Sequence, residues 1–364
     1  MGRLAPLDWM RGLVMVLMVV DHASIAFNGG RVAEDSAVLY HGGALPLAQA
    51  MLRWITHLCA PTFVFLAGTA LALSTQARAA RGESAWSIDR HLLIRGVFIL
   101  LLDVVWQSRL ASRTMLLQVL YAIGISIVAM VPLRRLHPRL LLGIGVAWFL
   151  IGELVTRAVW DVSNPVPGFV VAALVGVYYT DPIHILYPAL PWLAMMMMGW
   201  AFGVFLRDRE APPIRQLVQG GLSALVVFVI VRGWNGYGNL GLLRLDDSVA
   251  QWLHVSKYPP SLSFASLELG LMALCLAGLF VAARYVAVRE RGPLLVFGQT
   301  ALFFYLLHFP LVFVLALARH GEIGAAGMTE TLLASVAVLV VLYPVCLGYR
   351  RLKRAYPTSV LQYL

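Results

Sequence analysis

Apolar stretches of helix length follow one another along almost the whole chain, with shorter polar segments between them. Most approach the ~20 residues that an α-helix needs to cross the hydrocarbon core of a bilayer. The pattern predicts an all-α polytopic membrane protein with about ten transmembrane helices, forming a single domain over residues 1–364. The predicted spans are residues 9–27, 57–74, 92–107, 115–133, 139–158, 189–206, 216–232, 262–284, 294–318 and 329–349.

Segment 168–179 is apolar but too short for an ordinary span. Three interpretations stay open for it: a re-entrant segment, an interfacial segment, or an eleventh transmembrane helix that would change the topology after it. Gly68 and Gly124 lie inside predicted spans, where glycine allows two helices to approach closely.

The segments between the predicted spans differ in charge. Most of the 28 Lys and Arg residues lie in or beside alternate segments, from residues 1–8 and 75–91 to 350–364. Cytoplasmic loops of membrane proteins collect basic residues, so both termini are predicted to be cytoplasmic. The net charge of +10 is then explained by topology, and nucleic acid is not an expected partner.

Composition excludes a soluble domain of this length. Hydrophobic residues make up 60% of the chain and charged residues 13%, and the mean hydropathy is +0.80. The three cysteines lie in apolar spans without zinc-site spacing, which predicts packing roles. The first apolar run is not followed by a small-residue cleavage site, so it is predicted to stay as a helix. The expected location is a membrane that the chain crosses several times.

Arg11 and His22 are unusual residues for the first predicted span. Eleven residues correspond to roughly 16 Å along a helix, about half the thickness of the hydrocarbon core. Ionisable side chains at such depth are costly and favour a functional role. The structural alternative is that Arg11 reaches the headgroups and His22 donates a hydrogen bond to a neighbouring helix.

Two further histidines, His57 and His308, are predicted at a depth similar to that of His22, in the outer half of the membrane. Histidine can act as a general base near neutral pH, so the three could form one polar site. Asp21 precedes His22 but points about 100° away from it on a helix. No metal is expected, because the histidines have no zinc-motif spacing.

The predicted outer loops, residues 28–56, 159–188 and 233–261, are long and rich in Gly, Asn, Trp, Tyr and Pro. Long ordered loops often carry function. We expect an outer substrate site there, formed by Asn235, Tyr237, Lys257 and Tyr258, with His57 and His308 near it.

Three acidic residues, Asp103, Glu153 and Glu268, lie in predicted spans. The structural interpretation is favoured for each of them, namely an ion pair with a nearby arginine such as Arg109 or Arg157.

Several strings of residues resemble a known family. The first two are Leu7-Asp8-Trp9-Met10-Arg11-Gly12 followed by Asp21-His22, and Thr56-His57-Leu58-Cys59-Ala60-Pro61-Thr62-Phe63. Later strings are Asn235-Gly236-Tyr237-Gly238, Ser256-Lys257-Tyr258-Pro259-Pro260-Ser261 and Phe304-Tyr305-Leu306-Leu307-His308. Together they are similar to the bacterial relatives of heparan-α-glucosaminide N-acetyltransferase, from residue 4 to about 315.

The resemblance implies an acyltransferase-like domain that takes an acetyl group from cytoplasmic acetyl-CoA and delivers it to a sugar across the membrane. The Arg11-x10-His22 spacing is also similar to that of bacterial enzymes that O-acetylate surface glycans. His22 then becomes the base, with Asp21 beside it, and Arg11 a cation near CoA. The heparan enzyme's histidine lies in the outer loop after the first helix, which makes His41 and His57 alternatives. Heparan itself is not implied as the acceptor. The resemblance to bacterial proteins implies the bacterial cytoplasmic (inner) membrane as the location of the chain.

CoA phosphates would be bound by guanidinium groups, and Arg11, Arg95, Arg289 and Arg291 are the predicted residues. Expected partners are acyl-CoA, an extracytoplasmic glycan or small acceptor, and membrane lipids; a homodimer stays open. A proton-coupled transporter or lipid flippase using Asp21, His22 and His308, and a membrane scaffold, are the competing hypotheses. Internal repeats, which are common in transporters, are not found in the sequence.

Overall fold

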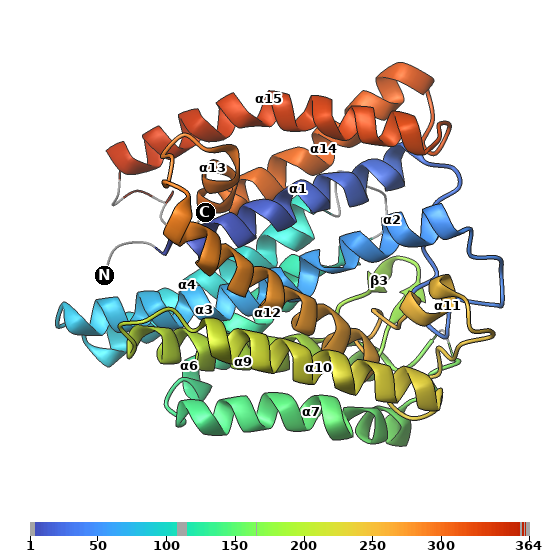
Figure 1. The fold of residues 1–364 in the computed structure, drawn as a ribbon, viewed down its shortest axis with the longest axis horizontal. Helices are drawn as coiled ribbons and strands as arrows, with labels where there is room; N and C mark the ends of the chain where they lie inside the picture. Colours follow the sequence, from blue (N-terminus) through green and yellow to red (C-terminus); the bar gives the residue numbers. More distant parts are fainter. Residues whose placement is uncertain (1–3, 108–114, 165, 357–358, 360, 362–364) are drawn as a thin grey trace. The chain divides into compact units, whose positions relative to one another are not determined.

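The computed structural model describes residues 4–107, 115–164, 166–356, 359 and 361. Its elements are mainly helices (Figure 1). They are α1 (Ala5–Phe27), α2 (Leu47–His57), α3 (Cys59–Ala80), α4 (Ala85–Leu102), the π-helix η1 (Asp103–Gln107), β1 (Met115–Leu117), α6 (Val119–Leu133), α7 (Pro138–Val159), α8 (Phe169–Leu174), β2 (Tyr178–Thr180), β3 (Ile183–Ile185), α9 (Ala189–Arg207), α10 (Ile214–Trp234), α11 (Val249–Leu253), α12 (Leu262–Tyr285), α13 (Pro293–Gln299), α14 (Ala301–His320) and α15 (Met328–Ala355).

Eight helical segments of the described chain are long and apolar enough to cross a membrane. They are Ala5–Phe27, Leu47–Ala80, Pro138–Val159, Ala189–Arg207, Ile214–Trp234, Leu262–Tyr285, Ala301–His320 and Met328–Ala355. The prediction of a helical protein that crosses the membrane several times is therefore confirmed. The number of ten spans and the cytoplasmic termini stay predictions.

The structure decides one interpretation that was left open and corrects two predicted spans. Segment 168–179 contains the six-residue helix α8 and then β2, and six helical residues rise only about 9 Å, so it is not an eleventh span. The predicted span 115–133 begins as strand β1. The predicted span 294–318 is divided at Thr300, which separates α13 from α14. The Thr300 hydroxyl donates to the Val296 carbonyl, a local bond that competes with helix continuation.

The fold is not entirely helical. The three short strands form a sheet in the order β1–β3–β2, in which β1 is parallel and β2 antiparallel to β3. Its residues pack with α8, where Leu117, Ala172 and Ile185 are buried together. The sheet replaces part of what the apolar pattern assigned to spans, because strands of three residues are too short to show a clear alternation.

The chain forms two compact units. Unit 1 contains residues 1–33, 44–59 and 272–364, and unit 2 contains residues 34–43 and 60–271. In unit 1, α1 packs against α2, α13, α14 and α15. Figure 1 shows α14 and α15, in orange and red, running beside α1 in blue. Because α2, α13, α14 and α15 all touch α1, the residues of α1 are the natural centre of a site here.

The contact between α1 and α13 is a close backbone approach. A Cβ atom at Gly12 would collide with the Leu294 carbonyl, and one at Gly298 with the Asp8 carbonyl. Glycine at both positions therefore lets the first turns of α1 lie directly on α13. The contact also fixes the polar residues Asp8 and Arg11 beside the end of α13.

Glycine also allows close backbone contacts between helices of unit 2. Gly68 of α3 lies against the Met196 carbonyl of α9, and Gly124 of α6 lies against the Gly96 carbonyl of α4. The predicted close approach at Gly68 and Gly124 is confirmed. Such contacts draw α3, α4, α6 and α9 into one helical core without large side chains between them.

Candidate functional site

His22 of α1 and His308 of α14 meet in unit 1. The Nδ1 atom of His22 lies 2.6 Å from Nε2 of His308, and the two rings are stacked with centroids 4.9 Å apart. Phe309 presents its ring edge-on to His22, at 5.1 Å between centroids. His308 is fully buried, whereas His22 is partly exposed. His22 is therefore the member of the pair that a reactant can reach.

The hydrogen bonds of His308 determine which nitrogen of His22 is basic. The Nδ1 atom of His308 lies 3.2 Å from the Phe304 carbonyl, which can only accept, so that nitrogen carries the proton. In a neutral ring, Nε2 of His308 then has a lone pair and must receive the proton of His22 Nδ1. This leaves Nε2 of His22 unprotonated, as a general base requires.

Asp21, the neighbour of His22 in the sequence, bonds to other parts of unit 1. Its Oδ1 atom accepts from Arg31 Nη2 at 2.8 Å, from Arg53 Nη1 at 2.7 Å and from the Thr56 hydroxyl at 3.0 Å. Arg53 and Thr56 belong to α2, and Arg31 lies in the loop between α1 and α2. The carboxylate therefore joins both α2 and this loop to α1. His57 comes directly after Thr56 and is buried at the end of α2. These bonds give Asp21 a role in positioning α2 against α1. A catalytic role for Asp21 or His57 stays a prediction.

At the other end of α1, a polar network contains Arg11. Its guanidinium lies 3.1 Å from the Asp8 carboxylate, which also accepts from Gln299 at 3.2 Å. Arg350 of α15 donates to the Gln299 side chain at 3.1 Å. Arg11 thus has an acidic partner within the protein. This contact is compatible with a structural role for Arg11 as well as with a contact to CoA.

The other predicted CoA residues lie in both units. Arg289 and Arg291 are exposed on the segment that leads into α13 in unit 1. Arg95 is on α4 in unit 2, where its charge acts on His91. His41, the alternative catalytic residue, is exposed in unit 2.

Two of the predicted substrate residues shape a loop of unit 2. Asn235 has a left-handed backbone that ends α10, and its amide donates to and accepts from the backbone of Arg244, at 2.9 and 2.6 Å. The Tyr237 hydroxyl donates to the Leu150 carbonyl at 2.5 Å. Both groups are used by the fold, and their contact with a substrate stays a prediction.

Lys257 and Tyr258 are packed inside unit 2. Lys257 is 2% exposed, its Nζ atom lies 5.3 Å from the centre of the Tyr258 ring, and its backbone N–H donates to the Asp35 carbonyl. A cation over an aromatic face is stabilised by the ring quadrupole. A buried lysine next to a tyrosine remains a good candidate for binding a ligand oxygen.

The acidic residues of the predicted spans have different partners. Glu153 accepts from Arg157 at 2.8 Å, which confirms the predicted pair, and also from the backbone of Gly238 and Leu240. Asp103 accepts from the backbone N–H groups of Gln118 and Tyr121 and so caps the start of α6. Its predicted partner Arg109 lies outside the described residues.

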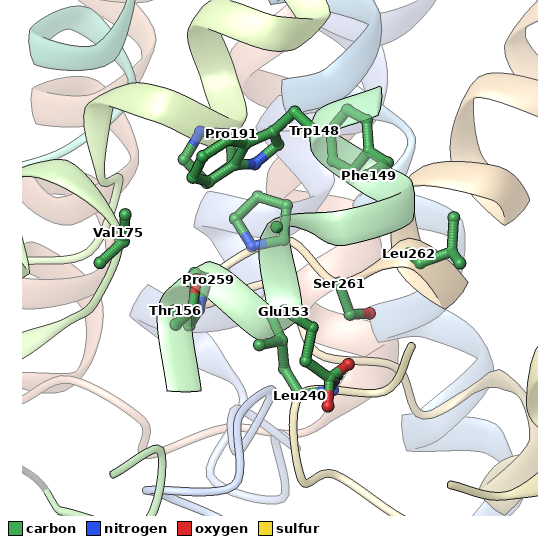
Figure 2. Close-up of a pocket in the computed structure, with 12 residues that line it drawn as sticks. Trp148, Phe149, Glu153, Thr156, Val175, Pro191, Leu240, Pro259, Ser261 and Leu262 are labelled. Carbon is green, nitrogen blue, oxygen red and sulfur yellow. Dashed lines mark hydrogen bonds between the residues drawn. The ribbon is translucent and has the colours of Figure 1, made fainter. Parts of the chain in front are cut away.

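Glu153 also lines a small hollow in unit 2. Figure 2 shows Trp148, Phe149 and Pro191 on one side of it and Glu153 and Leu240 on the other. Both Glu153 oxygens are bonded within the protein. The described residues contain no group of three or more His, Cys, Asp or Glu side chains that could hold a metal ion.

Sequence comparison decides the family. Residues 3–232 match the heparan-alpha-glucosaminide N-acetyltransferase catalytic family. The chain belongs to this family. No curated protein matches the chain. The match to the N-acetyltransferase family contains Arg11, Asp21 and His22 but ends before the strings at Asn235, Lys257 and His308.

The sequence allowed His22, His57 and His308 to form one polar site; of these, the structure brings His22 and His308 into direct contact. They are separated by 286 positions, and no local pattern links them. Arg31, Arg53 and Thr56 were not singled out. The signal for Arg53 was present, since an arginine in the apolar face of a helix needs a buried acidic partner.

Proposed function

We propose that this member of the N-acetyltransferase family moves an acetyl group from cytoplasmic acetyl-CoA to an extracytoplasmic sugar or other small acceptor. The observation that carries the proposal is the His22–His308 pair, whose hydrogen bonds leave Nε2 of the more exposed ring, His22, without a proton. The family supplies the class of reaction, and the eight apolar helical segments supply the membrane. The proposed setting is the inner membrane of a bacterium.

The proposed step is a direct acyl transfer. The acceptor's hydroxyl or amine attacks the thioester carbonyl carbon while Nε2 of His22 removes its proton. The carbon–sulfur bond then breaks, CoA leaves as a thiolate, and the protonated His22 returns the proton to that sulfur. His308 acts through His22: it accepts the Nδ1 proton, fixes the tautomer and holds the ring in one orientation.

CoA would be bound on the basic side by guanidinium groups, which suit phosphate because they form paired hydrogen bonds. In unit 1 the exposed pair Arg289 and Arg291 is better placed for this than Arg11, whose charge is already balanced by Asp8. Arg95 is the candidate from unit 2. Asn235, Tyr237, Lys257 and Tyr258 stay candidates for the acceptor side.

The test is His22→Asn in the purified protein, measured by release of CoA from acetyl-CoA in the presence of a mixture of acceptor sugars. Asparagine keeps a polar side chain but cannot act as a base, so turnover should fall on the order of 10²–10⁴-fold while CoA affinity is kept. His41→Ala and His57→Ala are the matched controls.

Near-normal turnover of His22→Asn together with an inactive His41→Ala would move the chemistry to the outer loop. If all three variants release CoA normally, the histidine mechanism is wrong. If the wild-type protein neither binds nor cleaves acetyl-CoA but moves protons through His22 and His308, the transporter hypothesis replaces the enzyme.

A further inference from the structure

The turn between α3 and α4 of unit 2 contains more positive than negative charge. Glu83, in this turn, accepts from Arg78 at 2.8 Å and from Arg81 at 3.0 Å. The single negative charge of Glu83 balances the charge of one of these arginines and not of both. The Arg81 side chain is 62% exposed, so a ligand can reach its guanidinium group from outside the protein.

A second group of charges lies beside the first. Asp89 of α4 accepts from Arg134 at 2.8 Å and also pairs with Arg135, and both arginines directly follow α6. Arg134 also donates to the carbonyl of Ala85, two residues after Glu83, at 3.2 Å. This bond holds the end of α6 at the first turn of α4, next to the turn that contains Glu83. Here too one carboxylate is shared by two guanidinium groups, and the Arg135 side chain is 56% exposed.

His91 shows that the positive charge of this region is not cancelled. His91 directly precedes the predicted span 92–107, and Nη2 of Arg78 lies 3.3 Å from each nitrogen of its ring. Burial lowers the pKa of His91 to about 4, and the charges of Arg78 and Arg95 act in the same direction. Glu83 opposes them with the smallest effect of the four. The arginines therefore act on His91 more strongly than the nearby carboxylate does.

An exposed tryptophan lies at the same place. Trp86 is in the first turn of α4, next to Ala85, and is 71% exposed. Tryptophan is enriched at the membrane–water interface, where its amphipathic ring lies at the level of the lipid headgroups. Trp86 and the arginines around it thus combine an interfacial anchor with groups that bind phosphate.

The end of α9, in the same unit, carries basic residues in a different arrangement. Arg207 bonds to its neighbour Asp208 at 2.8 Å, and the guanidinium of Arg209 lies 4.8 Å from the centre of the Phe205 ring. Each of these arginines has its own local partner, as is sufficient for residues that only set the topology. The sharing of one carboxylate by two arginines, twice within one region, is therefore a local feature of the start of α4.

We infer that the guanidinium groups at the start of α4 bind the headgroup phosphate of an anionic phospholipid. The residues are Arg78, Arg81, Arg134 and Arg135, with Trp86 at the level of the lipid glycerol. Guanidinium groups form paired hydrogen bonds with phosphate, and basic pockets at the cytoplasmic ends of transmembrane helices bind anionic headgroups. A zwitterionic lipid fits less well, because its own cation would be repelled. The inference does not depend on acyl transfer.

The experiment is native mass spectrometry of the full-length protein in a polyoxyethylene detergent. The protein is titrated separately with dioleoyl phosphatidylglycerol, dioleoyl phosphatidylcholine and CoA, whose phosphates are the alternative source of the same chemistry. Phosphatidylglycerol should bind about tenfold more tightly than phosphatidylcholine, and its affinity should fall as salt is added.

The variant that tests the surface is the double change Arg81→Gln and Arg135→Gln. It removes the two exposed guanidinium groups, while Glu83 and Asp89 each keep their other arginine, so the melting temperature should stay close to that of the wild type. A basic residue near an anionic lipid surface contributes about a factor of five to binding. Phosphatidylglycerol binding should therefore weaken roughly 20- to 30-fold in the double variant and about fivefold in each single variant, and the single variants decide if the double variant does not fold.

The matched control is the double change Arg207→Gln and Arg209→Gln, which alters the net charge equally and should weaken phosphatidylglycerol binding less than about twofold. Trp86→Ala should weaken phosphatidylglycerol binding and leave CoA binding unchanged. Equal affinities for the two lipids, or equal losses in the test and control variants, would overturn the inference. A larger loss of CoA affinity than of lipid affinity in the test variant would also overturn it, and would assign these arginines to CoA instead.

Discussion

Asp21 in unit 1 and Glu268 in unit 2 are both buried carboxylates, but the protein treats them in opposite ways. Asp21 accepts from two arginines and a threonine, whereas Glu268 has a lysine nearby and no hydrogen bond within the described chain. A saturated carboxylate fixes the helices around it, and an unsaturated one keeps its bonding capacity for something else. In unit 1 the bonds of Asp21 hold α2 against α1 near His22, whereas Glu268 of unit 2 makes no such link within the described chain.

The largest expected effect tests the structural half of this comparison. Asp21→Ala removes the carboxylate between Arg31 and Arg53 and leaves buried positive charge behind, so the free energy of unfolding should fall by about 3–5 kcal/mol. Glu268→Gln breaks no hydrogen bond and should change it by less than about 1 kcal/mol. Denaturant unfolding in mixed micelles measures both. Equal losses would show that Glu268 is as structural as Asp21.

The second prediction concerns the hydrogen bond between His22 and His308 in unit 1. His308→Leu removes the acceptor for His22 Nδ1–H, so kcat should fall on the order of 10²-fold with little change in KM. His308→Asn can still accept this proton through its amide oxygen and should recover part of the rate. The acidic limb of the pH profile, on which His22 becomes protonated and stops acting as a base, should move in the leucine variant. Equal rates in the two variants would mean that His308 serves packing alone.

The third prediction separates the units by their affinity for CoA. The double change Arg289→Ala and Arg291→Ala should weaken CoA binding about tenfold in calorimetry at low salt, since two exposed guanidinium groups are lost. Arg11→Ala should have a smaller effect because its charge is already paired with Asp8. A stronger effect of Arg95→Ala than of the double change would place the phosphates on unit 2.

The smallest expected effect is a pH dependence of stability that arises from His254 in a loop of unit 2. Burial lowers the pKa of His254 below its ordinary value, against the opposing charge of Asp35. As pH falls below about 6.5, the unfolded chain takes up a proton that the folded chain refuses, so stability decreases toward acid. His254→Gln should flatten the change in melting temperature between pH 7 and pH 5. If the melting temperature of His254→Gln changes between pH 7 and pH 5 as much as that of the wild type, folding does not lower the pKa of His254.

The positions of most helices could be predicted from the sequence. The apolar runs at 139–158, 189–206, 216–232 and 262–284 coincide closely with α7, α9, α10 and α12, because the thickness of a bilayer sets the length of each run. The predictions failed where a short local bond decided the backbone. Thr300 divides one run, and the sheet with α8 occupies segments that hydropathy alone cannot distinguish from part of a helix.

The sequence by itself determined the kind of protein: a helical membrane chain of the N-acetyltransferase family, with His22, His57, His308 and a few buried acids as unusual residues. The tertiary structure decided which of these residues meet. His22 and His308 meet although 286 positions separate them, Asp21 bonds to α2, and Glu268 makes no hydrogen bond within the described chain. The reason is physical: hydropathy is summed along one helix, whereas a hydrogen bond requires two side chains on different helices to be within about 3 Å, which only their packing determines.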